Sequence, residues 1–257
     1  MDIAEVRELL QAYGFAHLEA QLRPLRSLRL VPGGRGAGRS RLGGAPCAPT
    51  GFAWPRSGIE PMAFLGQLSL AEVRAVLPES PLSDAGWLLF FYEQDATVHG
   101  DEPEDGARGR VLLVEEAGGL APVAAPAGLE RSHPEYSLAL VPEWTLPDHV
   151  SAQVERLGLD ERERRRYFDL CDALAIRQAP VDAALTGEAP QHRLLGYPAL
   201  VQDEPDGADE WRLLLQLDSD LDLEMLWGDA GRLYFLLHAD AQPDGLERST
   251  RAVLQST

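Results

Sequence analysis

The most informative stretch of this 257-residue chain reads Asp84-Ala85-Gly86-Trp87-Leu88-Leu89-Phe90, and it recurs as Asp229-Ala230-Gly231-Arg232-Leu233-Tyr234-Phe235. In the 13-residue windows that begin at these two aspartates, seven positions are identical, where about one identity is expected at ordinary composition. Asp-Ala-Gly before an apolar run is typical of a tight turn that leads into a central strand. Each window is therefore predicted to hold a turn followed by a buried strand.

Two earlier blocks recur in the same order. Arg41–Pro46 matches Arg193–Pro198, and Phe64–Leu68 matches Leu213–Leu217. Both copies of the first block carry a glycine two residues before the proline, which favours a positive φ or a close approach of two backbones. Ordered self-similarity of this kind indicates two related units that stack to bury one core. We therefore expect an internal duplication whose halves pair about a pseudo-twofold axis.

Apolar spacing predicts the remaining elements. Helical spacing indicates helices over residues 2–22 and 157–175. Ser69 and Glu72 form the sequence pattern of a capping box for a short helix that ends at Leu77. Strands are expected over residues 87–92, 111–115 and 136–141, the first of them covered on both faces.

Two polar stretches separate these elements. The Gly- and Arg-rich residues Val31–Ser40 predict a flexible link, and the acidic residues Glu93–Arg110 predict an exposed loop or hairpin tip. The expected fold class is α+β, with an internally duplicated, antiparallel-rich sheet and helices packed outside.

The same reading divides the chain into four segments of one compact body. Residues 1–37 hold the N-terminal helix and the link, and residues 38–150 form the first repeat half. Residues 151–190 hold a connecting helix, and residues 191–257 form the second repeat half.

The charge balance bounds the partners. The chain has 23 Lys and Arg residues against 41 Asp and Glu residues, a formal charge of −18. A field of this sign repels nucleic-acid backbones and anionic membrane surfaces, so we expect no nucleic-acid partner and no membrane partner. The partner is expected to be a protein or a small molecule.

The basic residues apart from histidine are all arginines, because the sequence contains no lysine. Schiff-base chemistry is therefore excluded, and with it pyridoxal-phosphate enzymes and class I aldolases. The lysines that bind nucleotide phosphates in P-loop proteins and protein kinases are missing too.

The cysteines and the N-terminus indicate a reducing compartment. Cys47 and Cys171 belong to no Cys-x-x-Cys pair, and the first residues carry no apolar signal core. No 18-residue apolar run follows, so a cytoplasmic location is expected.

Motifs for catalysis, metals and cofactors are missing. The six histidines show no metal-ligand spacing, and neither a Gly-x-Ser-x-Gly elbow nor a dinucleotide-binding loop occurs in the right context. Asp218-x-Asp220-x-Asp222 begins like a calcium-binding loop, but Leu223 stands where glycine is required. A solvated acidic loop is the favoured interpretation, and we predict no catalytic residue, no metal site and no cofactor.

Polar residues inside apolar strands are the best candidates for a site. Gln67 and Gln216 occupy matching places, where an unsatisfied buried amide costs about 1–3 kcal/mol. One interpretation is that each amide bonds to backbone at a strand end, and the other places both amides at a shared cleft between the halves. Arg41 and Arg193 also have two interpretations. In one, each guanidinium binds an anion through two donors, and in the other each pairs with local carboxylates.

Trp227 and Asp229 complete the set of candidates for ligand or partner binding. A tryptophan in an apolar run is more often part of the core, and an aspartate before Ala-Gly more often forms a turn. The same reasoning applies to Trp54. We nevertheless expect any site to lie where the two halves meet.

These residues resemble the YwqG-like family of bacterial proteins, most of them of unknown function. The matching patterns are Gly43-Gly44-x-Pro46, Trp54-Pro55, Pro61-Met62-x-Phe64-Leu65-x-Gln67-Leu68, Gly86-x-Leu88-x-Phe90-Phe91, Arg193–Pro198, Gln202, Leu215-Gln216-Leu217 and Trp227-Gly228-Asp229-x-Gly231-x-Leu233-Tyr234-Phe235. The likeness extends from about residue 38 to residue 240, and the lysine usual beside the first Gly-Gly is Arg41 here. The resemblance implies an α+β fold made by duplication, with no established reaction.

We expect a non-catalytic binding or protein-interaction module, with bacterial toxin-neutralising or regulatory systems as one setting. The alternative is a hydrolase or metal-assisted enzyme that uses a carboxylate cluster near Asp229, with Asp218 and a distant histidine. A deep pocket around a strand-end carboxyl group with a shifted pKa would favour the enzyme.

Overall fold

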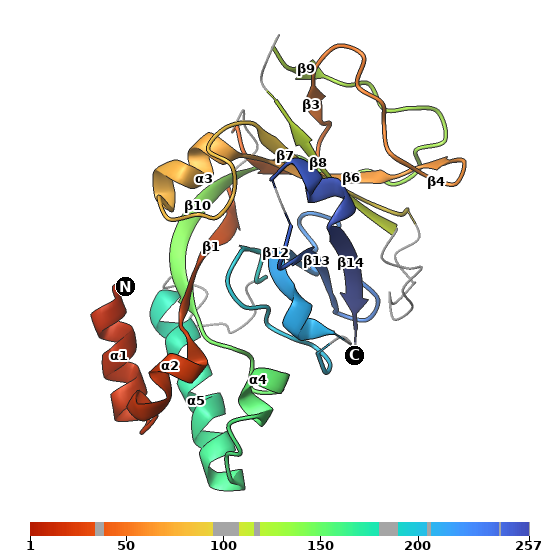
Figure 1. The fold of residues 1–257 in the computed structure, drawn as a ribbon. Coiled ribbons are helices and arrows are strands. Elements are labelled where there is room, and N and C mark those ends of the chain that lie inside the picture. The colour runs from red at the N-terminus through yellow and green to blue at the C-terminus, as the bar shows by residue number, and fades with distance from the viewer. Residues whose placement is uncertain are drawn as a thin grey trace.

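The computed structural model describes residues 1–33, 39–94, 108–115, 119–179, 190–204, 207–241 and 243–256. Within this part the chain is a mixed α+β structure built on one antiparallel sheet of ten strands (Figure 1). The strands of this sheet are β1 (Leu25–Pro32), β2 (Arg41–Leu42), β6 (Ala63–Ser69), β7 (Trp87–Tyr92), β8 (Gly109–Val114), β10 (Tyr136–Thr145), β11 (Arg193–Leu194), β12 (Trp211–Asp218), β13 (Arg232–His238) and β14 (Thr250–Gln255). Two small two-stranded sheets pair β3 (Cys47–Ala48) with β9 (Ala121–Pro122) and β4 (Arg56–Ser57) with β5 (Glu60–Pro61).

The strand order has a centre and two flanks. It runs β14-β13-β12-β11-β1-β10-β2-β6-β7-β8, with the long pair β1 and β10 in the middle. We call β2, β6, β7 and β8 the first unit, and β11, β12, β13 and β14 the second unit. The α+β, antiparallel part of the predicted fold class is thereby confirmed.

The sheet is nearly closed and barrel-like, because its edge strands β8 and β14 come together. A Cβ atom added at Gly109 of β8 would collide with Ala252 of β14. The rings of Phe90 and Phe235 lie 5.3 Å apart, so β7 and β13 also meet across the interior. The main core fills this interior with aliphatic and aromatic side chains from both units.

Every residue of β7 is buried, which confirms the strand predicted from the apolar run at 87–92. The strands predicted at 111–115 and 136–141 are also present, as β8 and as the longer β10. Residues 95–107 of the predicted loop at 93–110 lie outside the described part of the chain.

Most of the helices gather in one group, and one helix lies apart from them (Figure 1). They are α1 (Ile3–Ala12), α2 (Glu19–Leu22), α3 (Leu70–Val76), α4 (Ala152–Glu155) and α5 (Glu161–Gln178), with short 3₁₀ turns η1 (Ala16–Leu18), η3 (Ala208–Glu210) and η4 (Pro243–Arg248). α1, α2, α4 and α5 gather at one end of β1 and β10 around their own apolar cluster, which includes Leu10, Phe15 and Tyr167. None of the helices in the described ranges is long and apolar enough to cross a membrane.

The first predicted helix is shorter than expected. Residues 2–22 form α1, a turn, η1 and α2 rather than one helix. Gly14 has φ +84°, a left-handed conformation that ends an α-helix, and the chain reverses there. Apolar spacing continued through this turn, so periodicity alone missed the break.

The second predicted helix, at 157–175, is shifted. α5 begins after Asp160, whose side chain accepts a hydrogen bond from the Glu163 amide in a complete capping box, and it continues to Gln178. Gly158 has φ +65° and separates α5 from the short α4.

The predicted capping box at Ser69 is half formed. Ser69 accepts a hydrogen bond from the amide of Glu72, as expected at a helix N-terminus. The Glu72 carboxylate instead accepts two hydrogen bonds from Ser40, one from its amide and one from its hydroxyl. Glu72 thus ties α3 to β2 rather than closing the box.

The predicted start of the link, at residue 31, is too early because it overlaps a strand. Leu25–Pro32 forms β1, which pairs with β10 along its whole length. Residues 34–38 lie outside the described part. The glycine and arginine content of the link therefore did not show that the strand before it continues to Pro32.

Candidate functional site

A polar clamp holds the loop after β2 in the first unit. Arg41 lies opposite Gln67 across β2 and β6 and donates to its side-chain oxygen at 2.9 Å. The same oxygen accepts the Cys47 amide at 2.8 Å, and Arg41 also donates to the Ala45 carbonyl at 2.6 Å. The loop is therefore fixed to the strand by two buried side chains.

A second clamp of the same design holds the loop after β11. Arg193 lies opposite Gln216 across β11 and β12, and it donates to the Tyr197 carbonyl at 3.0 Å. The Gln216 side chain accepts the Ala199 amide at 2.9 Å and donates to the Gln191 carbonyl at 2.7 Å. Gln216 therefore bonds to backbone at both ends of its amide.

The arginines of the two clamps differ in their acidic partner. Arg193 donates to the buried carboxylate of Glu143 at 2.7 Å, and Arg29 donates to it at 2.8 Å. Arg41 instead lies 3.5 Å from the half-exposed carboxylate of Glu135. Burial favours a raised pKa for Glu143, but the charges and hydrogen bonds of Arg193 and Arg29 hold its pKa below the usual value.

The predicted site residues are not gathered in one hollow. Gln67, Gln216 and Arg41 are buried in the clamps described above. Trp227 is buried in the main core and donates its indole N–H to the Asp218 carbonyl, whereas Asp229 is exposed in the turn before β13. Of the six candidates, Arg193 lines a hollow of about 610 Å³ that residues of β10 and α5 also line.

The acidic sequence at 218–222 differs from the solvated loop that we expected. Asp218 and Asp220 are largely buried. Asp220 accepts the amides of Asp222 and Leu223 and contacts His192 Nε2 at 3.1 Å, while Asp218 accepts the Gln191 amide and lies 3.1 Å from Arg232. These carboxylates hold the turn together. Among the described residues, no group of three or more His, Cys, Asp or Glu side chains is placed to hold a metal ion.

The outer face of the first unit is covered by the chain itself. Phe64, Leu89 and Phe91 form the strand side of this face, and a segment that includes Phe52 and Trp54 packs against them. The rings of Trp54 and Phe91 meet edge to face, 5.6 Å apart. Trp54 also donates its indole N–H to the Met62 carbonyl, so it belongs to a packed layer, in line with the structural interpretation.

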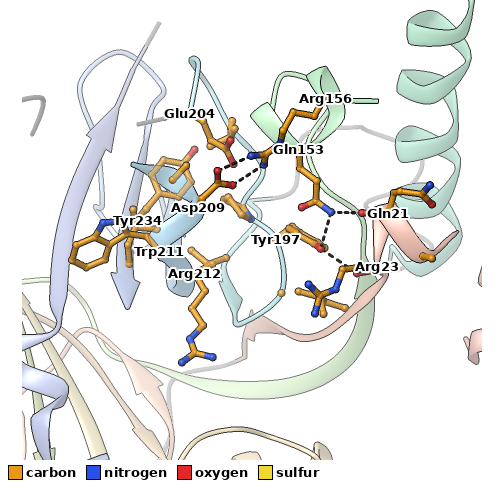
Figure 2. A pocket seen from close by; sticks show the side chains of 18 residues that line it. Gln21, Arg23, Gln153, Arg156, Tyr197, Glu204, Asp209, Trp211, Arg212 and Tyr234 are labelled. Carbon is orange, nitrogen blue, oxygen red and sulfur yellow. Dashed lines mark hydrogen bonds and ion pairs between the residues drawn. The ribbon is translucent and has the colours of Figure 1, made fainter. Parts of the chain in front are cut away.

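The matching face of the second unit is also buried, with exposed fractions of 2% for Leu213 and Tyr234 and 7% for Leu236, but different segments cover it and they leave a cavity. Leu213, Tyr234 and Leu236 take the places of Phe64, Leu89 and Phe91, as the strand registers and the shared β-bulge show. Only a small apolar cluster forms here, with Val253 and Trp211. Above it lies a cavity of about 430 Å³, which we call the C-terminal cleft (Figure 2).

The β-bulge in β12 decides which way Leu213 faces. It falls between Leu213 and Leu215, so Leu213 faces the cleft while Leu215 and Leu217 face the main core. Strict alternation along a strand would place Leu213 and Trp211 on the same face as Leu215. An extra residue in one strand reverses the facing of all residues before it.

Four separate parts of the chain build the walls of the cleft (Figure 2). The end of α2 meets Gln153 of α4, whose amide donates to the Gln21 carbonyl at 2.6 Å. Tyr197, from the loop held by the second clamp, donates its hydroxyl to the Arg23 carbonyl at 3.1 Å. On the sheet side, the Tyr234 hydroxyl donates to the Ala199 carbonyl at 2.8 Å. Burial raises the pKa of both tyrosines, so they remain neutral donors.

Aromatic and charged side chains complete the rim. Trp211 is braced by the Arg251 guanidinium, 4.5 Å from its ring centroid. Arg156 and Asp209 form two hydrogen bonds of 2.6 Å across one side of the cleft. Burial raises the pKa of Glu204, although its carboxylate accepts the Ala152 amide at 2.8 Å.

Two differences between the repeated blocks coincide with this cleft. Tyr197 stands where the first block has Ala45, and Tyr234 stands where the other repeat has Leu89. Both tyrosines line the cleft and bond to backbone with their hydroxyls. Arg23, Gln153 and Arg212 also line it, but they lie outside every repeated block, so no pattern marked them.

Comparison with known proteins identifies the family but no activity. The family described as "Domain of unknown function (DUF1963)" matches residues 40–243, and the chain belongs to it. The matched range contains both clamps and most of the cleft, whereas the end of α2, β1 and β14 lie outside it. No curated protein matches the sequence.

Proposed function

We propose that this DUF1963 protein is a non-catalytic binding module whose ligand enters the C-terminal cleft. The observation that carries the proposal is a cavity between an apolar sheet face and the segments that cover it. The matching face of the first unit is packed by the chain's own Phe52 and Trp54, whereas the second face is left beneath a cavity of about 430 Å³. Cavities of roughly 300–1,000 Å³ with apolar floors and few polar groups are typical ligand sites.

The chemistry of the cleft supports binding rather than catalysis. Among its described lining residues there is no Ser, Thr, Cys, His or Lys side chain, and its two carboxylates, Glu204 and Asp209, are bonded to the Ala152 amide and to Arg156. The tyrosine hydroxyls donate to backbone carbonyls, and Arg156 and Asp209 bond to each other. These polar groups hold the walls in place and leave a preformed hollow.

A filling variant tests the proposal. Leu236→Phe gives the second unit the aromatic residue that the first unit carries at Phe91, and its larger side chain enters the cleft. We expect the wild type to bind the neutral aromatic probe 2-naphthol in isothermal titration calorimetry, and Leu236→Phe to lose at least tenfold in affinity. Leu221→Phe makes the same change at a side chain that is 79% exposed, and it should bind as the wild type does.

Two results would count against the proposal. Wild-type protein without 2-naphthol binding would remove it, and so would equal binding by a folded Leu236→Phe variant. If Leu236→Phe fails to fold, Leu213→Phe, which copies Phe64, serves in its place. The absence of catalysis is tested separately. Metabolites and metals are screened for compounds that raise the melting temperature, and each such compound is incubated with the protein and analysed by mass spectrometry. Conversion of one of them at the cleft would show that the protein is an enzyme.

We infer further that the two units descend from one duplicated ancestor. The clamps support this inference, because Arg41 opposes Gln67 as Arg193 opposes Gln216, and both glutamines accept the amide at the same loop position. Gly44 and Gly196 have φ of +74° and +78°, as expected from the repeated block. The repeated patterns are also those that resemble the YwqG-like proteins, and we propose that the chain belongs with them inside DUF1963.

A further inference from the structure

The charge of the C-terminal cleft is opposite in sign to that of the whole chain. Among the described residues that line it are three arginines, Arg23, Arg156 and Arg212, against two carboxylates, Glu204 and Asp209. The whole chain carries a formal charge of −18. The cleft is therefore a locally cationic place on a strongly acidic protein.

Two of these arginines remain available to a ligand. Arg156 is occupied by Asp209, which binds it through both carboxylate oxygens. Arg23 and Arg212 form no ion pair among the described residues, and Arg212 donates a hydrogen bond to the Ala239 carbonyl at 2.6 Å. Figure 2 shows them on opposite walls, Arg23 at the end of α2 and Arg212 on β12. A guanidinium that has no carboxylate partner keeps most of its donors free for an anion.

The floor between these arginines is apolar and aromatic. Leu213 and Leu236 form it, and Trp211 and Tyr197 stand at its sides. Flat apolar groups fit such a floor, because aromatic walls contribute a large contact area at little entropic cost. An occupant that satisfies the whole cleft therefore has an apolar body and an anionic end.

We propose that the C-terminal cleft binds an amphipathic organic anion, a small carboxylate with an aromatic or aliphatic ring as its body. This proposal rests on the binding function assigned to the cleft above and names the class of its ligand. The ring lies on Leu213 and Leu236 beside Trp211, and the carboxylate meets Arg23 or Arg212 at the rim. Glu204 stands on the same rim and disfavours a second negative charge.

A series of three probes with one ring system tests the charge preference. The probes are 2-naphthoate, 2-naphthol and 2-naphthylmethylammonium, titrated calorimetrically at pH 7 and low ionic strength. We expect 2-naphthoate to bind about tenfold more tightly than 2-naphthol, since a charge-assisted hydrogen bond is roughly twice as strong as a neutral one. The cationic probe should bind least, and added salt should reduce the preference for 2-naphthoate.

Charge variants locate the preference. The double variant Arg23→Gln with Arg212→Gln should abolish the preference, so that the ratio of 2-naphthoate to 2-naphthol affinity falls to about one. Arg177→Gln is the control for the overall field, because it removes a charge from an exposed arginine of α5 that does not line the cleft.

The outcomes separate this proposal from the binding function. If 2-naphthol binds in the cleft but 2-naphthoate shows no preference, or if the double variant keeps the preference, the ligand class is wrong and the binding function stands. If none of the three probes binds, the binding function itself is overturned. A preference that Arg177→Gln reduces as strongly as the double variant would mean that only the overall field matters, and it would also overturn the proposal.

Discussion

The outer faces of the two units start from the same strand pattern and end differently. In the first unit, Phe64 and Phe91 are sealed beneath Phe52 and Trp54. In the second unit, Leu213 and Leu236 stand at the same places and form the floor of a cavity. The strand registers, the bulges and the loop clamps agree, so the difference lies in the connecting segments. The strands and clamps are therefore the framework that both units share, and the connecting segments determine which unit has a cavity for a ligand.

The largest expected difference in stability between the two units concerns the carboxylates that pair with the clamp arginines. Glu143→Gln removes a buried carboxylate between Arg29 and Arg193, and it should lower the free energy of unfolding by about 3–5 kcal/mol because the arginines keep their charges. Glu135→Gln, beside Arg41, should cost only about 0–1 kcal/mol since that carboxylate is 44% exposed. Urea unfolding of both variants measures the difference. Equal losses would show that the two clamps depend on their carboxylates alike.

The Glu143 carboxylate should also make the free energy of unfolding depend on pH. The folded pKa of Glu143 is lower than its ordinary value of 4.5, so its contribution is complete above that value and is lost as the pH falls through the folded pKa. The wild type should therefore lose stability more steeply below pH 4.5 than Glu143→Gln. Parallel profiles of unfolding free energy against pH would contradict the assignment.

Truncation at matched positions compares the faces directly. Phe91→Ala removes a ring that contacts three other aromatic rings, and we expect a loss of about 3–5 kcal/mol. Leu236→Ala should cost about 2 kcal/mol, near the lower end for a buried leucine, because part of its surroundings is already a cavity. Chemical denaturation gives both numbers. A larger loss at Leu236 would mean that the second face is packed as fully as the first.

The clamp glutamines should give smaller and similar losses. Gln67→Leu and Gln216→Leu each leave loop amides unsatisfied, at a cost of about 1–3 kcal/mol. The fold should persist in both variants. Only Gln216→Leu should also weaken 2-naphthol binding, because its clamp holds the loop that carries Tyr197 into the cleft. Weaker binding in Gln67→Leu would link the first clamp to the site and break the contrast.

Much of the frame was readable from the sequence, because it depends on local patterns. The run at 87–92 predicted β7, and the glycine of the repeated block predicted the left-handed turn at Gly44 and Gly196. Gln67 and Gln216 were singled out as polar groups in apolar strands, and the structure shows what each amide bonds to.

The cleft was not readable, for two physical reasons. Its walls come from α2, α4, the loop at 196–200 and β12, and only the tertiary fold brings such distant segments together. The bulge before Leu215 also turned Leu213 outward, which no period-two pattern predicts. Substitution of tyrosines for Ala45 and Leu89 in the second copies was the one local sign of a different environment.

The most direct test asks which of the two outer faces accepts a ligand. Isotope-labelled wild-type protein is titrated with 2-naphthol, and the backbone amide shifts are followed by NMR. The account predicts shifts at Tyr197, Leu213 and Leu236, while Phe64, Leu89 and Phe91 stay unchanged. Shifts centred on Phe64 and Phe91, or equal shifts on both faces, would contradict the claim that the cavity at the outer face of the second unit is the binding site.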